Sequence, residues 1–454
     1  MNRIEFRGIA IVALAVAFAA QAPCADADGR GDRFRPFGSP QAEFGSDANS
    51  TNARSSSQTS SSQPRATEAL TGFDNSTNGY LDQGPPFDQI DDESVVVGRS
   101  FNDNRFVFEE VETVADGLGP TYNAQSCAEC HQNVATGGAS QVTEHRTGRS
   151  NGDNFFEAPG GSLIQSRATF PDIVERVQVQ DDVRTFRIST NTLGAGYVEA
   201  IANTTLLAIR DAQPGSMRGT ATMVAVLEAD GAARVGRFGW KSQHASLQSF
   251  AADAYLNEMG ITSPLMPDEN TYSGRFIGFG TPYDPTPDPE DDGDDVIAFA
   301  DFMRSTKAPS RGPITSDVAA GERVFAQIGC ATCHVASITT AAPGTSINGG
   351  EFVVPSALGN KIIHPYSDFL LHDIGSGDGI PLLPTPELAG TATQIRTAPL
   401  WGLRTRNRLM HDGLSFTYPD VIRRHAGQAA GVTARYYGLS STQRKVLAAF
   451  LDSL

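Results

Sequence analysis

Alternating apolar and polar residues mark the middle of the chain as its β-forming part. The segments Arg176 to Gln180 (RVQVQ) and Arg184 to Thr190 (RTFRIST) alternate with a period of two, which predicts half-buried strands. The segment Met223 to Phe238 contains Asp230-Gly231, a dipeptide that is typical of a tight turn between two paired strands. We therefore expect a small β-rich region in this part of the chain.

Helical periodicity with capping residues is clearest towards the C-terminus. Thr315 or Ser316 is expected to cap an amphipathic helix that ends near Gly329. Ser440 or Ser441 is expected to cap the last helix of the chain. Four apolar residues fall on one face of that last helix: Leu447, Phe450, Leu451 and Leu454.

The N-terminus has the pattern of a signal peptide. Arg3 and Arg7 provide a basic start, and Ile9 to Ala20 is a run of 12 apolar residues, which is too short to span a bilayer comfortably. We expect cleavage within residues 1–25 and a periplasmic or secreted protein without a transmembrane segment. The residues before Cys24 match the lipidation pattern poorly, so a lipid anchor is not expected.

Two stretches have the composition of unstructured connections. Residues 26–75 are rich in Ser, Gly, Asn, Gln and Asp and lack periodic apolar residues, which predicts a disordered tether. Folding is expected to begin near Phe87, with the apolar run Ser94 to Gly98. The acidic, proline-rich stretch Thr281 to Asp295 lacks the spacing of a known calcium loop. We interpret it as a solvated linker whose last aspartates cap a helix that begins near Asp295.

Composition limits the classes of partner. The chain has 454 residues, of which 39% are hydrophobic and 19% charged, enough to bury the cores of two or three domains. Its 52 acidic residues against 35 basic ones give a formal charge of -17. Such a chain repels phosphate backbones and anionic lipid, so nucleic acid and membrane surfaces are not expected as partners.

Four of the five cysteines belong to two copies of one motif. Both copies read C-x-x-C-H, with Cys127, Cys130 and His131 in the first and Cys330, Cys333 and His334 in the second. This is the covalent attachment pattern of c-type haem, because two thiols add to the haem vinyl groups and the adjacent histidine binds the iron. The chain is therefore expected to carry two covalently bound haems.

Two other uses of such cysteines are weaker explanations. A C-x-x-C pair can act as a redox dithiol or as half of a zinc site, but neither use needs a histidine directly after each second cysteine. The motif histidines lie 203 residues apart (334 minus 131), so each haem can have its own domain. An odd and sparse cysteine count also argues against a disulfide scaffold.

Further segments carry a family resemblance. They are Gly117 to Ser126 (GLGPTYNAQS), Leu193 to Ile201 (LGAGYVEAI), Gly236 to Lys241 (GRFGWK), Tyr366 to Asp373 (YSDFLLHD), Arg396 to Leu403 (RTAPLWGL) and His411 to Gly413 (HDG). From about residue 90 to its end, the chain resembles the bacterial di-haem oxidoreductase (thiol oxidoreductase) family. This family is more distantly similar to the di-haem cytochrome c peroxidases and to cofactor-maturing and rubber-cleaving di-haem enzymes. The resemblance implies one haem that stores and passes electrons and another that meets peroxide or oxygen.

The resemblance to the peroxidases also implies a distal ligand for the second haem. In that pattern a histidine-containing turn follows an A-P-L segment, and the distal ligand comes at a fixed spacing after the turn. Here the turn holds His411, after Ala398 to Leu400, and the ligand position is His425 (411 plus 14). The peroxidases usually place methionine there, whereas histidine would make this haem bis-histidine and lower its potential. Met410 is the alternative ligand.

Near the first haem, the peroxidase pattern implies an inter-haem Trp, then a Gln, then a Glu ten residues after that Gln. Trp240, Gln248 and Glu258 occupy these places, although the step from Trp to Gln is two residues shorter than in the peroxidases. A carboxylate above an open iron can take a proton from peroxide and return it to the leaving oxygen. A flat indole between two haems can relay electrons.

Two other positions concern ligands of the haem pair. His145 follows His131 at a short spacing (131 plus 14), near a Gly-rich loop, and is a candidate sixth ligand of the first iron, although an open or water-bound iron is favoured. By the same alignment on the histidine turn, Arg406 and Arg408 stand where the peroxidases have calcium donors. The resemblance therefore makes a calcium ion between the haems doubtful.

We expect a mainly α protein with two cytochrome c-like haem domains, over residues 76–309 and 310–454. The first carries a β-rich insertion at about 150–240. The expected function is a peroxidase-like, di-haem oxidoreductase whose N-terminal haem receives electrons from a C-terminal bis-histidine haem. A plain electron-transfer cytochrome, or an oxygenase or protein-modifying oxidase, is the alternative. Peroxide or oxygen is the expected small reactant, and the negative charge favours a small, basic redox protein as partner.

Overall fold

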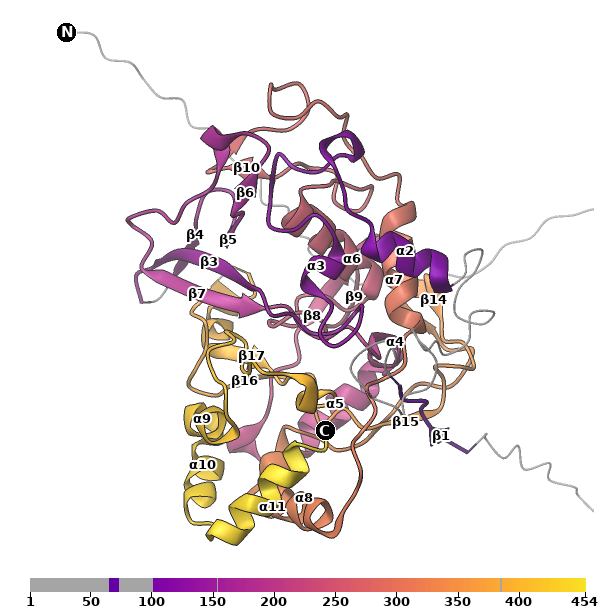
Figure 1. Cartoon of the computed structure of the whole chain (residues 1–454), viewed down its shortest axis with the longest axis vertical. Helices are drawn as coiled ribbons and strands as arrows, with labels where there is room; N and C mark the ends of the chain where they lie inside the picture. The colour runs from indigo at the N-terminus through magenta and orange to yellow at the C-terminus, as the bar shows by residue number, and fades with distance from the viewer. Residues whose placement is uncertain (1–64, 73–100, 153, 384–385) are drawn as a thin grey trace, which may run out of the picture. The chain divides into compact units, whose positions relative to one another are not determined.

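The computed structural model describes residues 65–72, 101–152, 154–383 and 386–454. The expected signal peptide with Cys24, most of the expected tether and the segment Ser94 to Gly98 lie outside these residues. Figure 1 shows helices together with several small sheets, and each sheet has two to four strands. The expectation of a mainly α protein is therefore corrected to a mixed fold, whereas the two cytochrome c-like domains stay a prediction.

Three helices form the centre of the larger hydrophobic core. They are α2 (Phe101–Glu109), α6 (Leu247–Ala254) and α7 (Asp294–Ser305), and α7 packs against the other two. Phe108 of α2 and Phe302 of α7 lie with their ring centroids 4.6 Å apart. Buried aromatic pairs of this kind add to the stability that apolar burial provides.

Helix α7 begins where the sequence predicts, but its cap differs. Gly293 is the N-cap residue and offers no side chain. The side chain of Asp291 instead accepts a hydrogen bond from the backbone N–H of Asp295 at 3.2 Å. Asp294 and Asp295 lie in the first turn, where negative charge stabilises the helix dipole.

A buried ion pair joins two of these core elements. Glu199, at the end of α4 (Ala195–Glu199), accepts hydrogen bonds from Nε and Nη2 of Arg304 at 2.8 and 3.1 Å. Glu199 also accepts hydrogen bonds from the backbone N–H of Leu247 and from the side-chain amide of Asn348. Burial by itself would raise the pKa of Glu199, but Arg304 and the hydrogen bonds lower it below its ordinary value.

Replacing Glu199 by Ala should strongly destabilise the protein. The carboxylate is fully buried, so its removal leaves Arg304 in the interior without its two hydrogen bonds to Glu199 and with only part of its charge balanced by the ion pair to Asp301. A loss of up to about 3 to 5 kcal/mol in the free energy of unfolding is expected when one partner of a buried ion pair is removed. Denaturant unfolding of the purified protein measures it, and Asp211→Ala, which removes an exposed ion pair, should have little effect. Equal stability of the two variants would contradict this account of Glu199.

The β-rich insertion contains a four-stranded antiparallel sheet. β3 (Thr143–Ser150) pairs with β4 (Phe155–Glu157), β5 (Leu163–Ile164) and β7 (Val183–Ile188). Figure 1 shows β3 and β7 running side by side. β7 confirms the strand that alternation predicted from Arg184 onwards.

The other two β predictions have different outcomes. β8 (Met223–Val226) and β9 (Ala232–Val235) form the expected antiparallel hairpin. The turn between them uses positive φ angles of 50° at Asp230 and 79° at Gly231, which suit this dipeptide. The predicted strand Arg176 to Gln180 is wrong.

Side chains explain why that strand does not form. The backbone N–H of Gln178 donates to the carboxylate of Asp181 at 3.3 Å, and the side chain of Gln178 donates to the carbonyl of Arg176. These local hydrogen bonds replace the ladder that a neighbouring strand would supply.

A short strand lies within the segment that we expected to be a disordered tether. β1 (Thr67–Glu68) runs parallel to β15 (Lys361–Ile363), which also pairs with β12 (Ile338–Thr339). Glu68 binds Nε2 of His364 at 2.9 Å. Residues 65–72 are therefore part of the folded structure, because their backbone groups pair with a strand far along the chain.

The C-terminal helices confirm the sequence prediction. Thr315 caps α8 (Ser316–Ile328), which ends at Gly329, and Ser440 caps α11 (Ser441–Leu451). The two helices pack together (Figure 1). A Cβ at Gly321 would lie 1.9 Å from the carbonyl oxygen of Val446, so the close approach of α8 and α11 requires glycine there.

The remaining helices and strands are short. They are β2 (Thr121–Tyr122), α3 (Cys127–Cys130), β6 (Arg167–Ala168), α5 (Asn203–Ala212), β10 (Thr271–Tyr272), β11 (Arg275–Phe276), β13 (Ser346–Ile347), β14 (Phe352–Val353), β16 (Leu371–Asp373), β17 (Gln394–Arg396), α9 (Tyr418–Arg424) and α10 (Ala430–Tyr437). Within the described ranges, no helix combines the length and apolar character that crossing a bilayer requires.

Candidate functional site

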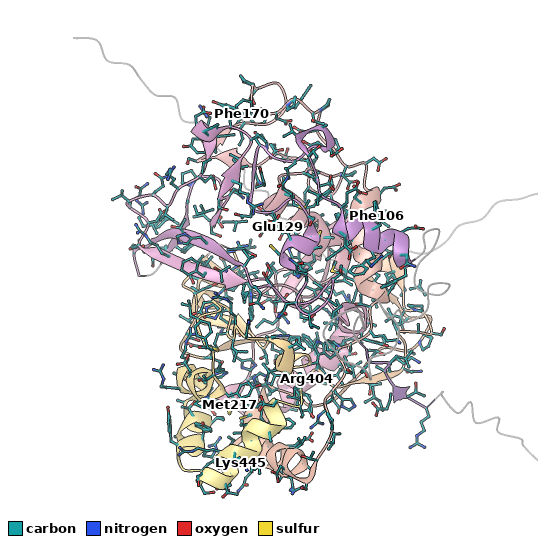
Figure 2. All side chains as sticks on the ribbon, viewed as in Figure 1. Phe106, Glu129, Phe170, Met217, Arg404 and Lys445 are labelled. Carbon is teal, nitrogen blue, oxygen red and sulfur yellow. The ribbon has the colours of Figure 1, made fainter. Side chains whose placement is uncertain are left out.

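The first C-x-x-C-H motif begins in a single capped helical turn. The side chain of Ser126 accepts a hydrogen bond from the backbone N–H of Glu129 at 3.1 Å and so caps the start of α3, which contains both cysteines. Glu129, labelled in Figure 2, also forms an ion pair with Arg167 of the insertion. His131 follows, and its Nδ1 lies 3.2 Å from the carbonyl oxygen of Gly138. When Nδ1 donates to that carbonyl, Nε2 keeps the lone pair that a metal ligand needs.

The second motif follows directly from α8. Gly329 ends the helix in a left-handed conformation, and a 3-10 turn then carries Cys330 to Thr332. Nδ1 of His334 lies 2.9 Å from the carbonyl oxygen of Tyr366, which repeats the arrangement at the first motif. Burial lowers the pKa of His334 to about 4, so this imidazole stays neutral and able to bind a metal at neutral pH.

A largely apolar cavity of about 200 Å³ adjoins the second motif. Its lining includes Cys330, Cys333 and His334 together with His425, the predicted distal ligand. His425 follows α9, and its Nδ1 lies 2.8 Å from the carbonyl oxygen of Val421, which again leaves Nε2 available. Burial lowers the pKa of His425 below its ordinary value. Two oriented, neutral histidines beside a cysteine pair fit a bis-histidine c-type haem.

Other residues complete this second cavity. Met410, the alternative ligand, also lies in its wall, as do Arg406 and Arg408. Nη2 of Arg406 donates to the carbonyl oxygens of Pro399 and Trp401, both at 3.3 Å. Met217, labelled in Figure 2, comes from the first half of the chain but still contributes to this wall. Part of the insertion therefore covers the second haem motif.

A second, more polar cavity of about 550 Å³ adjoins the first motif. His131, Trp240 and Glu258, which the sequence analysis assigned to the first haem, all line it. Glu144 and Arg146 of β3 line the same cavity and form an ion pair at 2.9 Å. The lining thus includes these carboxylates and this guanidinium among other charged groups, which can bind a small polar reactant and exchange protons with it.

Glu258 has the electrostatics of a proton-exchanging group. It lies in a π-helical turn (Tyr255–Met259) that continues α6, and its Oε2 accepts a hydrogen bond from Nδ2 of Asn123 at 3.1 Å. Burial, followed by the neighbouring carboxylate of Glu144, raises the pKa of Glu258 well above its usual range. Arg146 and Asn123 act in the opposite direction. A carboxyl group with a raised pKa can release and take up a proton near neutral pH.

Trp240 lines both cavities. Its indole N–H donates to the carbonyl oxygen of Ile188 at 2.7 Å, which fixes the ring at the end of β7. The ring also meets His411 edge-on, with centroids 6.1 Å apart. One aromatic ring therefore borders the cavity beside each motif.

The structure does not place His145 as a ligand. His145 stacks on Phe186 of β7 with centroids 4.8 Å apart. Its neighbours Glu144 and Arg146 line the cavity, whereas His145 is absent from the lining. Successive side chains of a strand point to opposite faces, so the side chain of His145 lies on the other face of β3 from Glu144 and Arg146. The role of His145 as an alternative sixth ligand stays a prediction.

Gln248 is another residue that the family resemblance assigned to the first haem. It lies on α6 but does not line the cavity, whereas Phe250, Asp253 and Ala254 of the same helix do. Gln248 precedes Phe250 by two residues, which turns its side chain by about 200° around the helix. A ten-residue spacing from Glu258 did not account for this rotation.

Sequence reasoning missed several polar residues of the first cavity. Glu144 and Arg146 were not identified, nor was His244, whose Nε2 lies 3.1 Å from the carboxylate of Asp253. The segment T-E-H-R-T contains the signal, since alternate charged residues in a strand indicate a polar face. The residues between the charged ones in this segment are also polar, so the alternation of apolar and polar residues that identifies a half-buried strand was missing.

Among the described residues, the four motif cysteines do not converge on one metal site, although Cys333 lies close to Asp368 and His372. This arrangement excludes a four-cysteine zinc site in that part of the chain. Burial raises the pKa of the Cys130 and Cys330 thiols to about 12. A redox dithiol needs the opposite shift. The surroundings of both motifs are consistent with c-type haem attachment.

A comparison with protein families agrees with this arrangement. Residues 163–454 match the family model described as "Di-haem oxidoreductase, putative peroxidase". A search of curated proteins finds no match. One similar solved structure is a MauG-like protein associated with microbial copper homeostasis, with 19% identity, 37% of this chain covered and a TM-score of 0.23. The chain spans 54% of that protein's length.

A second similar structure is hydrazine synthase from Kuenenia stuttgartiensis, with 13% identity and a TM-score of 0.33. That match covers 86% of this chain and 100% of the other. The family match spans most of the chain and includes Trp240, Glu258, the second C-x-x-C-H motif and His425. This protein therefore belongs to the di-haem oxidoreductase family.

Proposed function

We propose that the protein is a peroxidase-like oxidoreductase with two covalent c-type haems, one at each C-x-x-C-H motif. The observation that carries this proposal is a pair of cavities that share Trp240. Each cavity is lined by one motif histidine, His131 in the first and His334 in the second. In this arrangement the second haem supplies electrons and the first is the reactive centre.

The different linings of the two cavities support this division of roles. The second cavity is mostly apolar, and His425 and His334 both line it, so these two histidines would hold the iron of a haem bound there. The first cavity is more polar than the second, and His145, the alternative sixth ligand, is not among its lining residues. His244 lines the first cavity, but its Nε2 contacts the carboxylate of Asp253 at 3.1 Å. A reactant therefore has room beside His131.

Glu258 is the proposed proton-transfer residue. A bound c-type haem supplies the redox chemistry at the first site. Glu258 can accept a proton from peroxide in the cavity and return it to the leaving oxygen. Glu144 keeps the pKa of Glu258 high, whereas Arg146 limits this rise and can orient an anionic reactant. Trp240 provides the contact between the two cavities.

The location and partner of the protein are part of the same proposal. Covalent c-type haem and a signal-peptide pattern together support a periplasmic or secreted enzyme. The formal charge of -17 supports a basic redox protein as electron donor. Electron transfer from such a donor should slow as salt concentration rises, because salt screens their attraction.

Spectroscopy of the purified protein tests the proposed function. Mass spectrometry should detect two haem adducts, and absorption or EPR spectra should show one low-spin and one reactive iron. Added peroxide should then oxidise the reduced protein rapidly. Two six-coordinate, low-spin irons in every redox state, with no response to peroxide, would indicate an electron-transfer cytochrome instead. Reaction with oxygen but not with peroxide would indicate an oxygenase or a protein-modifying oxidase.

A further inference from the structure

Four carboxylates meet in a region outside both haem cavities. Glu269, Asp284, Asp288 and Glu290 each place one oxygen so that all four lie within 4.8 Å of one another. Glu269 is 8% exposed and Asp284 is 5% exposed. The interpretation of Thr281 to Asp295 as a solvated linker is therefore corrected, since its acids are partly buried and converge.

The hydrogen bonds of these carboxylates leave one side of each group unused. Three of them accept a backbone N–H through a single oxygen: Asn270 donates to Oε1 of Glu269 at 2.6 Å, Thr286 to Oδ1 of Asp284 at 2.9 Å and Thr262 to Oε2 of Glu290 at 2.8 Å. In the described part of the chain, the following buried oxygens have no hydrogen-bond partner: Oε2 of Glu269, Oδ2 of Asp284, Oδ1 of Asp288 and Oε1 of Glu290. Buried acceptors without a donor are costly unless an unseen donor or cation satisfies them.

Two glycines make room for this arrangement. A Cβ at Gly278 would lie 2.7 Å from Cβ of Glu269, and a Cβ at Gly117 would lie 2.6 Å from Cβ of Glu290. Gly117 also has a φ of 104°, which favours glycine. The backbone thus approaches closely behind both glutamates and holds them in place.

The four neighbouring carboxylates repel one another when they are ionised. Burial, with added repulsion from the neighbouring carboxylates, raises the pKa of Glu269 to about 9 and that of Glu290 to about 7. Burial likewise raises the pKa of Asp284. Within residues 65–72, 101–152, 154–383 and 386–454, no Lys, Arg or His forms an ion pair with the four acids. A bound cation would remove both the repulsion and the unpaired acceptors.

We propose that Glu269, Asp284, Asp288 and Glu290 form a calcium site. Calcium takes six to eight oxygen ligands at about 2.3 to 2.6 Å, so oxygens on opposite sides of the ion lie about 4.6 to 5.2 Å apart. The four oxygens, which all lie within 4.8 Å of one another, are close enough to share one such ion. Magnesium binds at about 2.0 to 2.1 Å and retains several waters, so four converging carboxylates suit it less well.

The calcium site is connected to the first haem cavity through the backbone. Glu290 accepts a hydrogen bond from the backbone N–H of Thr262. Thr262 lies three residues after the end of the π-helical turn that carries Glu258. Gly117, which packs against Glu290, begins the segment that leads to the first C-x-x-C-H motif. Arg406 and Arg408, where the family resemblance made calcium doubtful, line the second cavity, whereas the four acids are not among its lining residues. The ion would therefore stabilise the segments next to the turn of Glu258 that Glu290 contacts.

Metal analysis and thermal unfolding of the full, haem-loaded protein test this site. After removal of metal with EGTA and re-addition of calcium chloride, elemental analysis should find one calcium per chain. Saturating calcium should raise the melting temperature by about 5 °C, since a ligand that binds only the folded state stabilises it. An equal rise with magnesium chloride would overturn the assignment to calcium. A protein that retains no calcium and melts at the same temperature with and without it would overturn the site.

Matched variants separate the site from general acidity. Glu269→Gln removes one ligand charge within the cluster, whereas Asp268→Asn removes one charge from its exposed neighbour. The first variant should lose at least ten-fold in calcium affinity and most of the calcium-dependent rise in melting temperature, and the second should behave as wild type. Equal calcium responses of the two variants would contradict the proposal. If Glu269→Gln folds poorly, Asp288→Asn should show the same loss of calcium affinity relative to a calcium titration of the wild-type protein. Neither measurement depends on the reactivity of the haems.

Discussion

Replacing Glu258 by Gln should lower peroxide turnover by roughly 10²- to 10⁴-fold, the usual contribution of a positioned acid-base residue. Glutamine keeps the size and the contact with Asn123 but cannot take a proton from peroxide. Haem attachment and the spectrum of the second haem should not change, since Glu258 lines only the first cavity. Steady-state turnover with a reduced donor, together with the rate of the first peroxide reaction, measures the effect.

The matched control for this variant is Gln248→Ala. Gln248 belongs to the helix that leads into the turn of Glu258, but it lies on another face and outside the cavity. Its replacement should leave turnover within about two-fold of wild type, as expected for a residue outside the proton-transfer path. If Gln248→Ala were as inactive as Glu258→Gln, or if Glu258→Gln kept full activity, the assignment of Glu258 would be wrong.

The pH dependence of turnover gives an independent measure of the same group. Because the pKa of Glu258 is raised, its carboxylate form appears only at higher pH than for an ordinary glutamate, and turnover should rise with pH through that pKa. Replacing Glu144 by Gln removes the neighbouring negative charge that helps to raise the pKa. The rising limb of the profile should then move to lower pH. A limb that moves to higher pH, or does not move, would contradict this coupling.

Local signals in the sequence were sufficient for part of this structure. The caps Thr315 and Ser440 and the Asp230-Gly231 turn depend on neighbours along the chain, so their helices and hairpin could be predicted. The C-x-x-C-H motifs carry their chemistry in five adjacent residues and needed no knowledge of the fold. Trp240 and Glu258 came from a family resemblance, and both line the first cavity.

Spatial relations that depend on one residue or on distant partners could not be predicted. The spacing of His145 from His131 did not show that His145 lies outside the cavity lining, because a shift of one position along β3 exchanges the cavity face for the opposite face. β1 was missed because the strand with which it pairs, Lys361–Ile363, lies in the distant C-terminal part of the chain. The acids of the proline-rich stretch were interpreted as solvated because composition does not show that Asp284 is buried beside Glu269.

Replacing His425 by Ala should convert the second haem from low spin to high spin. His425 lines a cavity that also holds His334, and a hydrogen bond from Nδ1 to the carbonyl of Val421 fixes the ring. Alanine leaves one axial position of that iron without its strong-field imidazole. The potential of the second haem should rise, since a bis-histidine pair favours the oxidised iron relative to weaker ligation. EPR and a spectroscopic redox titration measure both changes.

Two comparisons decide whether this effect belongs to His425. His364→Ala removes an exposed histidine bound to Glu68 and should leave both haem spectra unchanged. Met410→Leu removes the alternative ligand, which lines the same cavity, and should also keep the second haem low spin. An unchanged spectrum for His425→Ala, together with a high-spin haem in Met410→Leu, would transfer the ligand role to Met410. Electron supply to the first haem would then come from a centre of higher potential, because methionine ligation raises the potential of a c-type haem.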